Sequence, residues 1–162
     1  KATSQPAHVR PFYRTNQFDP YEPNEGADTN ADGMPDQITR VPSALTAKGD
    51  FYGYLSSAAD KDYYLIDSDW GGSICVEATG GRVIDLEVYS YLDRWDNVTH
   101  ATPADGVVDG LIWESTTDAT KKCFYGSNVV PYRYGEYRFV IGVKSHAGSF
   151  SPHWPYWITA TK

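Results

Sequence analysis

The sequence predicts an all-β fold: a β-sandwich, jelly-roll-like, with about eight strands. Short runs rich in Val, Ile, Tyr, Phe and Trp are separated by turns that contain Gly, Pro, Asn or Asp. Two of these runs alternate apolar and polar residues, which is typical of a strand with one buried face. No segment keeps a helical period, and no internal repeat occurs.

Eight strand-like runs follow one another after residue 50. They span residues 51–55, 62–67, 73–79, 83–91, 107–114, 121–125, 134–144 and 154–161. In the fourth run, Ile84, Leu86 and Val88 alternate with polar residues, so we expect them on one buried face. In the seventh run, Phe139 and Ile141 alternate with other residues in the same way. The glycine pairs at 71–72 and 80–81 predict turns.

The length and charge of the chain limit what it can be. Its 162 residues suffice for one domain with a sizeable core, which we expect over residues 19–162, with 1–18 as a polar tail or linker. The net charge of −7 argues against nucleic acid and anionic membranes as partners. No apolar run approaches the ~18 residues of a membrane span, so we expect no membrane insertion.

The two cysteines, Cys75 and Cys123, each lie in a strand-like run, and no CxxC motif accompanies them. A disulfide between them would close a loop of about fifty residues and stabilise the fold by roughly 4 kcal/mol on the chain-entropy model. The alternative is a pair of buried free thiols. Together with the acidic loop described next, the cysteines favour a secreted, disulfide-bonded protein.

An acidic stretch between residues 19 and 36 has the spacing of a calcium loop. Positions 1, 3, 5 and 9 of the loop are Asp28, Asn30, Asp32 and Asp36. Gly33 at position 6 allows the sharp turn between early and late oxygen ligands. Position 12 is Thr39, where an EF-hand has Glu, so the loop is not a complete EF-hand; it resembles the DxDxDGxxD loops of thrombospondin type 3 repeats. The alternative is a solvated linker whose residues favour turns.

Further motifs resemble those of bacterial pre-peptidase C-terminal domains. They are Tyr21-Glu22-Pro23-Asn24, Asp60-Lys61-Asp62-Tyr63-Tyr64, Asp85-Leu86-Glu87-Val88-Tyr89 and the strand at 134–141. The resemblance implies a compact β-sandwich at the end of a secreted protease or other extracellular enzyme, similar to the collagen-binding domains of clostridial collagenases. It also implies calcium ligands at Glu22, Asn24, Asp60 and Asp62. The loop at 28–36 looks inserted, which leaves one or two calcium ions open.

No catalytic motif stands in the sequence. GxSxG and HExxH are absent, and the four histidines are scattered. Flat aromatic side chains bind sugar rings or extended polypeptides, and the candidates for a ligand face are Trp95, Trp113, Tyr132 and Trp154. The alternative for each is packing within the sandwich.

We therefore expect a non-catalytic, calcium-binding accessory domain of a secreted bacterial protein, attached to a protease or other extracellular enzyme. Its partner would be a collagen-like polypeptide or a polysaccharide. The alternatives are a carbohydrate-binding module, a spacer without a ligand and a small secreted hydrolase; similar folds support all of them.

Overall fold

A long antiparallel ribbon, rolled up on itself, makes the fold. The computed structural model describes residues 24–27, 29, 31, 34–41, 51–68, 72–91, 108–128 and 137–161. The strands are β1 (Thr39–Arg40), β2 (Phe51–Leu55), β3 (Lys61–Ser68), β4 (Ser73–Ala78), β5 (Ile84–Tyr91), β6 (Val108–Ser115), β7 (Lys121–Tyr125), β8 (Tyr137–Ser145) and β9 (Ser151–Ala160). A short 3-10 turn, η1 (Gly126–Asn128), follows β7.

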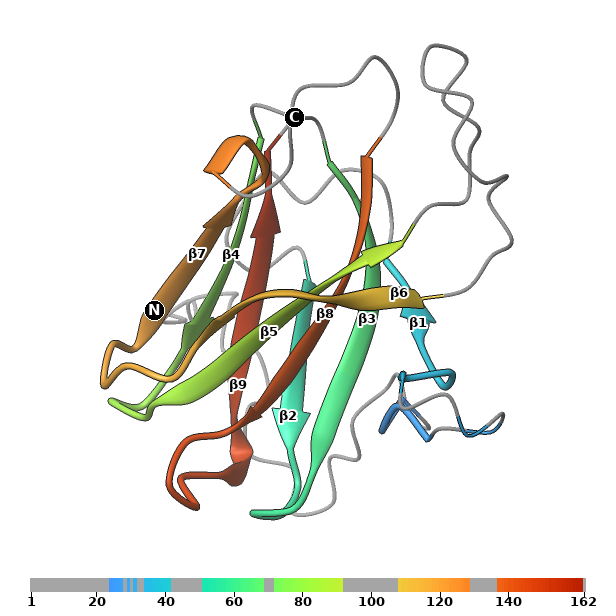
Figure 1. Cartoon of the computed structure of the whole chain (residues 1–162). Coiled ribbons are helices and arrows are strands. Elements are labelled where there is room, and N and C mark those ends of the chain that lie inside the picture. Colours follow the sequence, from blue (N-terminus) through green and yellow to red (C-terminus); the bar gives the residue numbers. More distant parts are fainter. Residues whose placement is uncertain are drawn as a thin grey trace, which may run out of the picture.

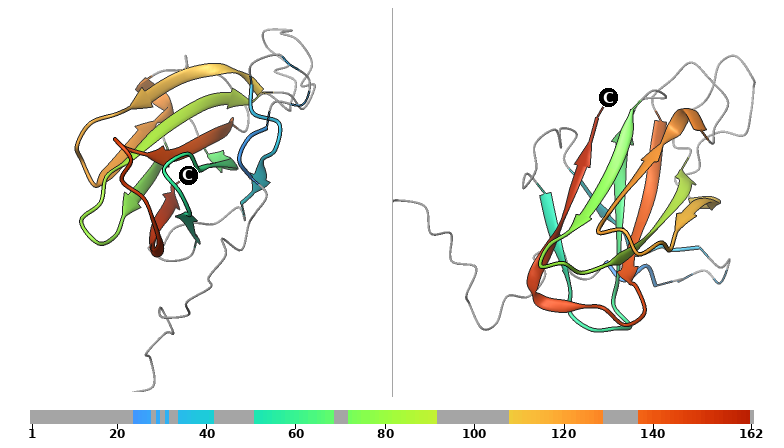
Figure 2. Two further views of the ribbon diagram at one scale, coloured as in Figure 1. Left: turned by 90° about the horizontal axis from the view of Figure 1, so that it is seen from below. Right: turned by 90° about the vertical axis from the view of Figure 1, so that its left-hand side faces the viewer.

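The strands form two sheets that pack face to face (Figures 1 and 2). The five-stranded sheet has the order β1-β3-β8-β5-β6 and the four-stranded sheet the order β2-β9-β4-β7. The antiparallel pairs β2·β9, β3·β8, β4·β7 and β5·β6 are those of a ribbon folded at its middle and then rolled up. This is the strand order of a jelly roll, so the predicted fold class is confirmed.

All eight predicted strands are present, and the structure adds β1. This strand has two residues and pairs in parallel with β3, with Thr39 opposite Tyr64 and Arg40 opposite Leu65. Its pairing partner is far away in sequence and its apolar pattern is too short to read, so the sequence analysis missed it. Within the described ranges, no helix is long and apolar enough to cross a membrane.

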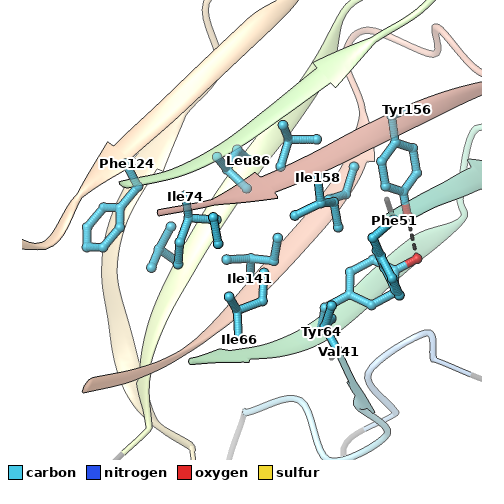
Figure 3. Packing of buried hydrophobic residues seen from close by; sticks show 14 of the residues in the cluster. Val41, Phe51, Tyr64, Ile66, Ile74, Leu86, Phe124, Ile141, Tyr156 and Ile158 are labelled. Carbon is cyan, nitrogen blue, oxygen red and sulfur yellow. Dashed lines mark hydrogen bonds between the residues drawn. The ribbon is translucent and has the colours of Figure 1, made fainter. Parts of the chain in front are cut away.

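The core lies between the two sheets and is built by the alternation that the sequence predicted (Figure 3). Ile84, Leu86 and Val88 of β5 face inward, and so do Phe139 and Ile141 of β8. Since each strand turns every second side chain toward the other sheet, a register slip by one residue would bring the polar set inside. The apolar alternation therefore fixes the register of both sheets.

One polar chain is buried within this core. Asp62 is fully buried on the inner face of β3, and its carboxylate accepts a hydrogen bond of 2.5 Å from the Tyr156 hydroxyl. That hydroxyl also lies 2.6 Å from the hydroxyl of Tyr64 (Figure 3). Gly53 leaves room for both phenols, since a Cβ there would lie 2.5 Å from the Tyr64 oxygen. The buried carboxylate is thus paired, as its burial requires.

Replacing Tyr156 by Phe should destabilise the protein by about 1–3 kcal/mol, because it removes a donor from a buried carboxylate while keeping the ring. Urea unfolding of the variant measures the loss. The matched control is Tyr125→Phe, since Tyr125 is 47% exposed. Equal losses in both variants would contradict a structural role for the Asp62–Tyr156 bond.

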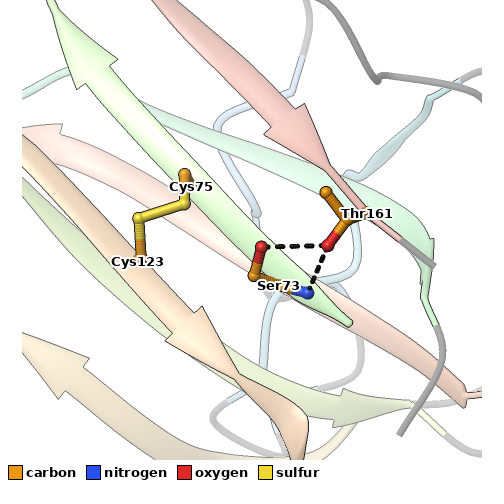
Figure 4. The surroundings of a disulfide bond; sticks show 4 residues. All are labelled: Ser73, Cys75, Cys123 and Thr161. Atoms are coloured by element: carbon orange, nitrogen blue, oxygen red, sulfur yellow. Dashed lines mark hydrogen bonds between the residues drawn. A yellow bond between two sulfur atoms is a disulfide. The ribbon is translucent and has the colours of Figure 1, made fainter. Parts of the chain in front are cut away.

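The predicted disulfide is present. Cys75 and Cys123 are directly opposite each other on β4 and β7, with a Cα–Cα distance of 4.1 Å (Figure 4). Their neighbours Ile74, Val76 and Phe124 are buried, so alternation places the sulfur atoms on the outer face of the four-stranded sheet. At the start of β4, Ser73 bonds to the Thr161 hydroxyl through its amide and its own hydroxyl (Figure 4).

Replacing both cysteines by serine should cost roughly 4 kcal/mol of unfolding free energy, because the bond closes a loop with a sequence separation of 48 residues. Chemical denaturation with and without reductant measures this cost in the unaltered chain. Mass spectrometry of unreduced peptides should find Cys75 linked to Cys123. Two thiols that react with an alkylating agent in the native protein would refute the bridge.

Candidate functional site

The acidic segment, residues 24–38, lies at the edge of the five-stranded sheet that β1 and β3 form (Figure 1). Two backbone hydrogen bonds close the base of its loop, from the Gly26 amide to the Gln37 carbonyl (3.1 Å) and from the Asp36 amide to the Ala27 carbonyl (3.3 Å). Gly26 has a φ of +66°, which glycine adopts without strain. The predicted calcium loop is therefore a closed loop held at its neck.

Asp36, the ninth position of the predicted loop, folds back onto the start of that loop. Its Oδ2 atom accepts hydrogen bonds from the amide and the hydroxyl of Thr29, each at 2.7 Å. Thr29 stands in the sequence between Asp28 and Asn30, the first and third predicted ligand positions. The contact therefore places the Asp36 carboxylate beside the residue that separates the first and third predicted ligand positions.

Of the other predicted ligands, the structure describes three. Asn24 is fully buried, and its carbonyl accepts a 2.8 Å hydrogen bond from the Tyr63 amide, so the segment is joined to β3. Asp60 is 7% exposed, and its Oδ2 accepts from the Ser56 amide at the turn before β3. Asp62 is bonded to Tyr156 in the core.

The ligand assignments of these residues stay predictions. Glu22, Asp28, Asn30 and Asp32 lie outside the described residues. Among the residues that are described, no group of three or more His, Cys, Asp or Glu side chains is placed to hold a metal ion. The candidate ligand atoms among the described residues are carboxylate and amide oxygens, and such oxygen ligands suit calcium rather than a transition metal.

Tyr63 joins the acidic segment to the sheet. A Cβ on Gly26 would collide with one edge of the Tyr63 ring, and a Cβ on Gly142 would lie 2.7 Å from the other edge, so the ring fills a slot between two glycines. Met34 and Ile38 of the segment pack against the small apolar cluster that Tyr63 forms with Val140. The segment thus has its own apolar contact with the outer face of the five-stranded sheet.

A polar cluster on this outer face lies beneath the segment. The Glu87 carboxylate accepts hydrogen bonds from the hydroxyls of Tyr89 (2.9 Å) and Tyr63 (3.4 Å), and it forms an ion pair with Lys144. Burial and the negative charge of Glu87 raise the pKa of Tyr63 to about 12. Burial, Tyr63 and Glu87 also raise the pKa of Tyr89. The cluster holds two neutral phenols around one carboxylate.

A second polar chain crosses between the sheets. The imidazole of His146 lies between two carboxylates, with Nδ1 2.8 Å from Asp85 and Nε2 3.1 Å from Asp118. Asp85 also pairs with Lys122 of β7 at 3.4 Å, and the Lys122 ammonium donates to the Ile84 carbonyl. The sequence analysis missed this chain; the one available signal was the outward position of Asp85 in the alternation of β5.

The four aromatic residues of the predicted ligand face differ in how the structure places them. Trp113 is partly buried against the core, with its ring centroid 5.7 Å from that of Phe124, as the packing alternative expects. Trp154 is 51% exposed. Trp95 and Tyr132 lie outside the described residues. Trp154 is therefore the predicted aromatic that the described structure presents to solvent.

No protein-family model and no curated protein matches the chain. Solved structures that resemble it include the pre-peptidase C-terminal domain of a collagenase from Bacillus anthracis, with 10% identity over 79% of this chain and 98% of that one and a TM-score of 0.43. Another is PliG of Aeromonas hydrophila, a periplasmic inhibitor of g-type lysozyme, with 16% identity over 76% and 96% and a TM-score of 0.38.

The raised pKa of Tyr63 predicts how stability depends on alkaline pH. The folded protein keeps a proton on this phenol that the unfolded chain releases from pH 10 upward, so stability is lost as pH rises from 10.0 to about 12. Urea midpoints measured from below pH 10 upward should fall less steeply for Tyr63→Phe than for the unaltered chain. Tyr125→Phe should keep the steep fall, and equal slopes in all three proteins would contradict the prediction.

Proposed function

We propose that the chain is a non-catalytic, calcium-stabilised module that attaches a larger secreted protein to an extracellular polymer. Calcium binding is proposed because the Asp36 carboxylate is hydrogen-bonded to Thr29 within a loop whose two ends are joined by backbone hydrogen bonds. The spacing of Asp28, Asn30 and Asp32 supplies the remaining oxygen ligands.

Calcium would act through the position of the acidic segment. Without a cation, the carboxylates that the loop gathers repel one another, and this repulsion opposes closure. A bound ion removes that cost and fixes the loop, while Asn24 and Gly26 hold the segment on Tyr63. The path of the chain that enters the module is then defined relative to the sandwich, which suits a domain that joins another.

The attachment part rests on the resemblance and on the exposed aromatic surface. The four-residue motif at Tyr21–Asn24 and the acidic strand at Asp60–Tyr64 resemble motifs of an accessory domain in secreted proteins. The disulfide is consistent with export to an oxidising compartment. The parent enzyme, if the module belongs to one, supplies the chemistry.

Calcium should raise the melting temperature of the protein, and EDTA should lower it. A ligand that binds only the native state adds about 2.7 kcal/mol at a hundredfold excess over Kd. The variant Asp36→Asn should lose most of this gain, because Asn still accepts a hydrogen bond from Thr29 but carries no charge. Asp118→Asn is the matched control, since the Asp118 side chain is 94% exposed and lies far along the chain from the loop.

Limited proteolysis reports on the segment itself. In EDTA, cleavage within the acidic segment should accelerate, and calcium should suppress it. Identical melts and identical cleavage in calcium and in EDTA would contradict the calcium part. Turnover of peptide, ester or glycoside substrates that one carboxylate substitution abolishes, without loss of the fold, would contradict the non-catalytic part.

A further inference from the structure

The start of β9 contains an irregularity that turns two side chains out of the sheet. Gly53 of β2 is opposite Tyr156, but Leu55 is opposite Ser151, so β9 uses more residues than β2 over the same length. The extra residues of β9 are 152–155, and among them the side chains of His153 and Trp154 are exposed. Bulges of this kind redirect side chains and are frequent beside functional sites.

The turn between β4 and β5 holds this bulge in place. The carbonyl of Trp154 accepts a hydrogen bond from the Arg82 guanidinium. The carbonyl of Pro155 accepts from both the amide (3.2 Å) and the hydroxyl (2.5 Å) of Thr79. The backbone that directly follows the Trp154 side chain is therefore held by two residues of this turn.

The indole ring of Trp154 lies flat on glycine backbone. A Cβ on Gly80 would be 3.2 Å from both Cγ and Cδ2 and 3.5 Å from Cδ1, which places Gly80 over the face of the five-membered ring. Gly80 and Gly81 have φ angles of +68° and +71°, and beside Gly81 a Cβ would meet nothing within 4 Å. The ring is supported from one side, yet 51% of the residue is exposed.

We propose that Trp154 is a stacking platform for a pyranose ring of an uncharged polysaccharide. This inference rests on the proposed attachment function and names its ligand and its site. A rigid, half-exposed aromatic face binds the CH-rich face of a sugar ring, and the entropy of ordering the ring has already been lost in the free protein.

Two observations favour this ligand over others. An extended polypeptide that adds to a sheet edge needs unpaired backbone groups, and here the carbonyls of Trp154 and Pro155 are already bonded to Arg82 and Thr79. A polyanion such as nucleic acid would be repelled by the net charge of −7. An uncharged polysaccharide that stacks a sugar ring on the indole needs no free backbone groups and is not repelled by the net charge.

The test is retention of the protein on insoluble cellulose, chitin and xylan, with fibrillar collagen as the polypeptide arm. We expect the unaltered chain to bind at least one polysaccharide, and Trp154→Ala to weaken that binding by about tenfold or more. Gly80→Ala should weaken it too, because the added methyl displaces the ring. Tyr125→Ala, an equally exposed aromatic on β7, should bind like the unaltered chain.

The outcomes separate this inference from the function on which it rests. Melting curves of all variants in calcium check that each one folds. Polysaccharide binding that survives Trp154→Ala would overturn the platform and leave the attachment function standing. Binding to collagen alone would overturn the polysaccharide ligand, and binding to none of the four polymers would overturn both the platform and attachment, with the calcium effect on melting judged separately.

Discussion

The ring of Tyr63 is held from both sides, by Gly26 of the acidic segment and by Gly142 of β8. The amide of the same residue donates to the Asn24 carbonyl, and its hydroxyl donates to Glu87. One side chain therefore connects the backbone at the sheet edge, the loop above it and the polar cluster on the sheet. Any displacement of the segment would expose the Tyr63 ring and leave an edge amide without its carbonyl partner, which costs free energy on both counts.

The two-sheet fold gives the acidic segment a second role, which is to cover an edge strand. In a sandwich the outer strand of each sheet has unpaired backbone groups, which other chains can join. This edge of β3 is covered by the segment through Asn24, and by the residues that follow the segment through β1 and the bond from the Val41 amide to the Leu65 carbonyl. A cation that fixes the loop would therefore also keep the edge covered, and would in this way oppose edge-to-edge aggregation.

The strands could be predicted from the sequence because their apolar residues alternate with a period of two. Contacts between positions far apart in the chain could not be predicted in this way. Alternation located the strands, and the strand-like setting of Cys75 and Cys123 allowed their pairing. By contrast, His146 meets Asp85 across 61 residues and Lys122 meets it across 37, distances that no local pattern spans. The loop spacing identified Asp36 as a candidate ligand, yet its bond to Thr29 depends on the closed neck, which only the folded chain provides.

The two candidate sites depend on different parts of the sandwich, and this separates their roles. The acidic segment rests on β3 and on the outer face of the five-stranded sheet. Trp154 rests on the turn between β4 and β5, through Thr79, Gly80 and Arg82, and none of these contacts includes the segment. Removal of the proposed cation would therefore change the stability and entry path of the module but leave the support of the indole ring in place. On the functions proposed above, calcium would set how the module is joined, and the aromatic platform would set what it binds.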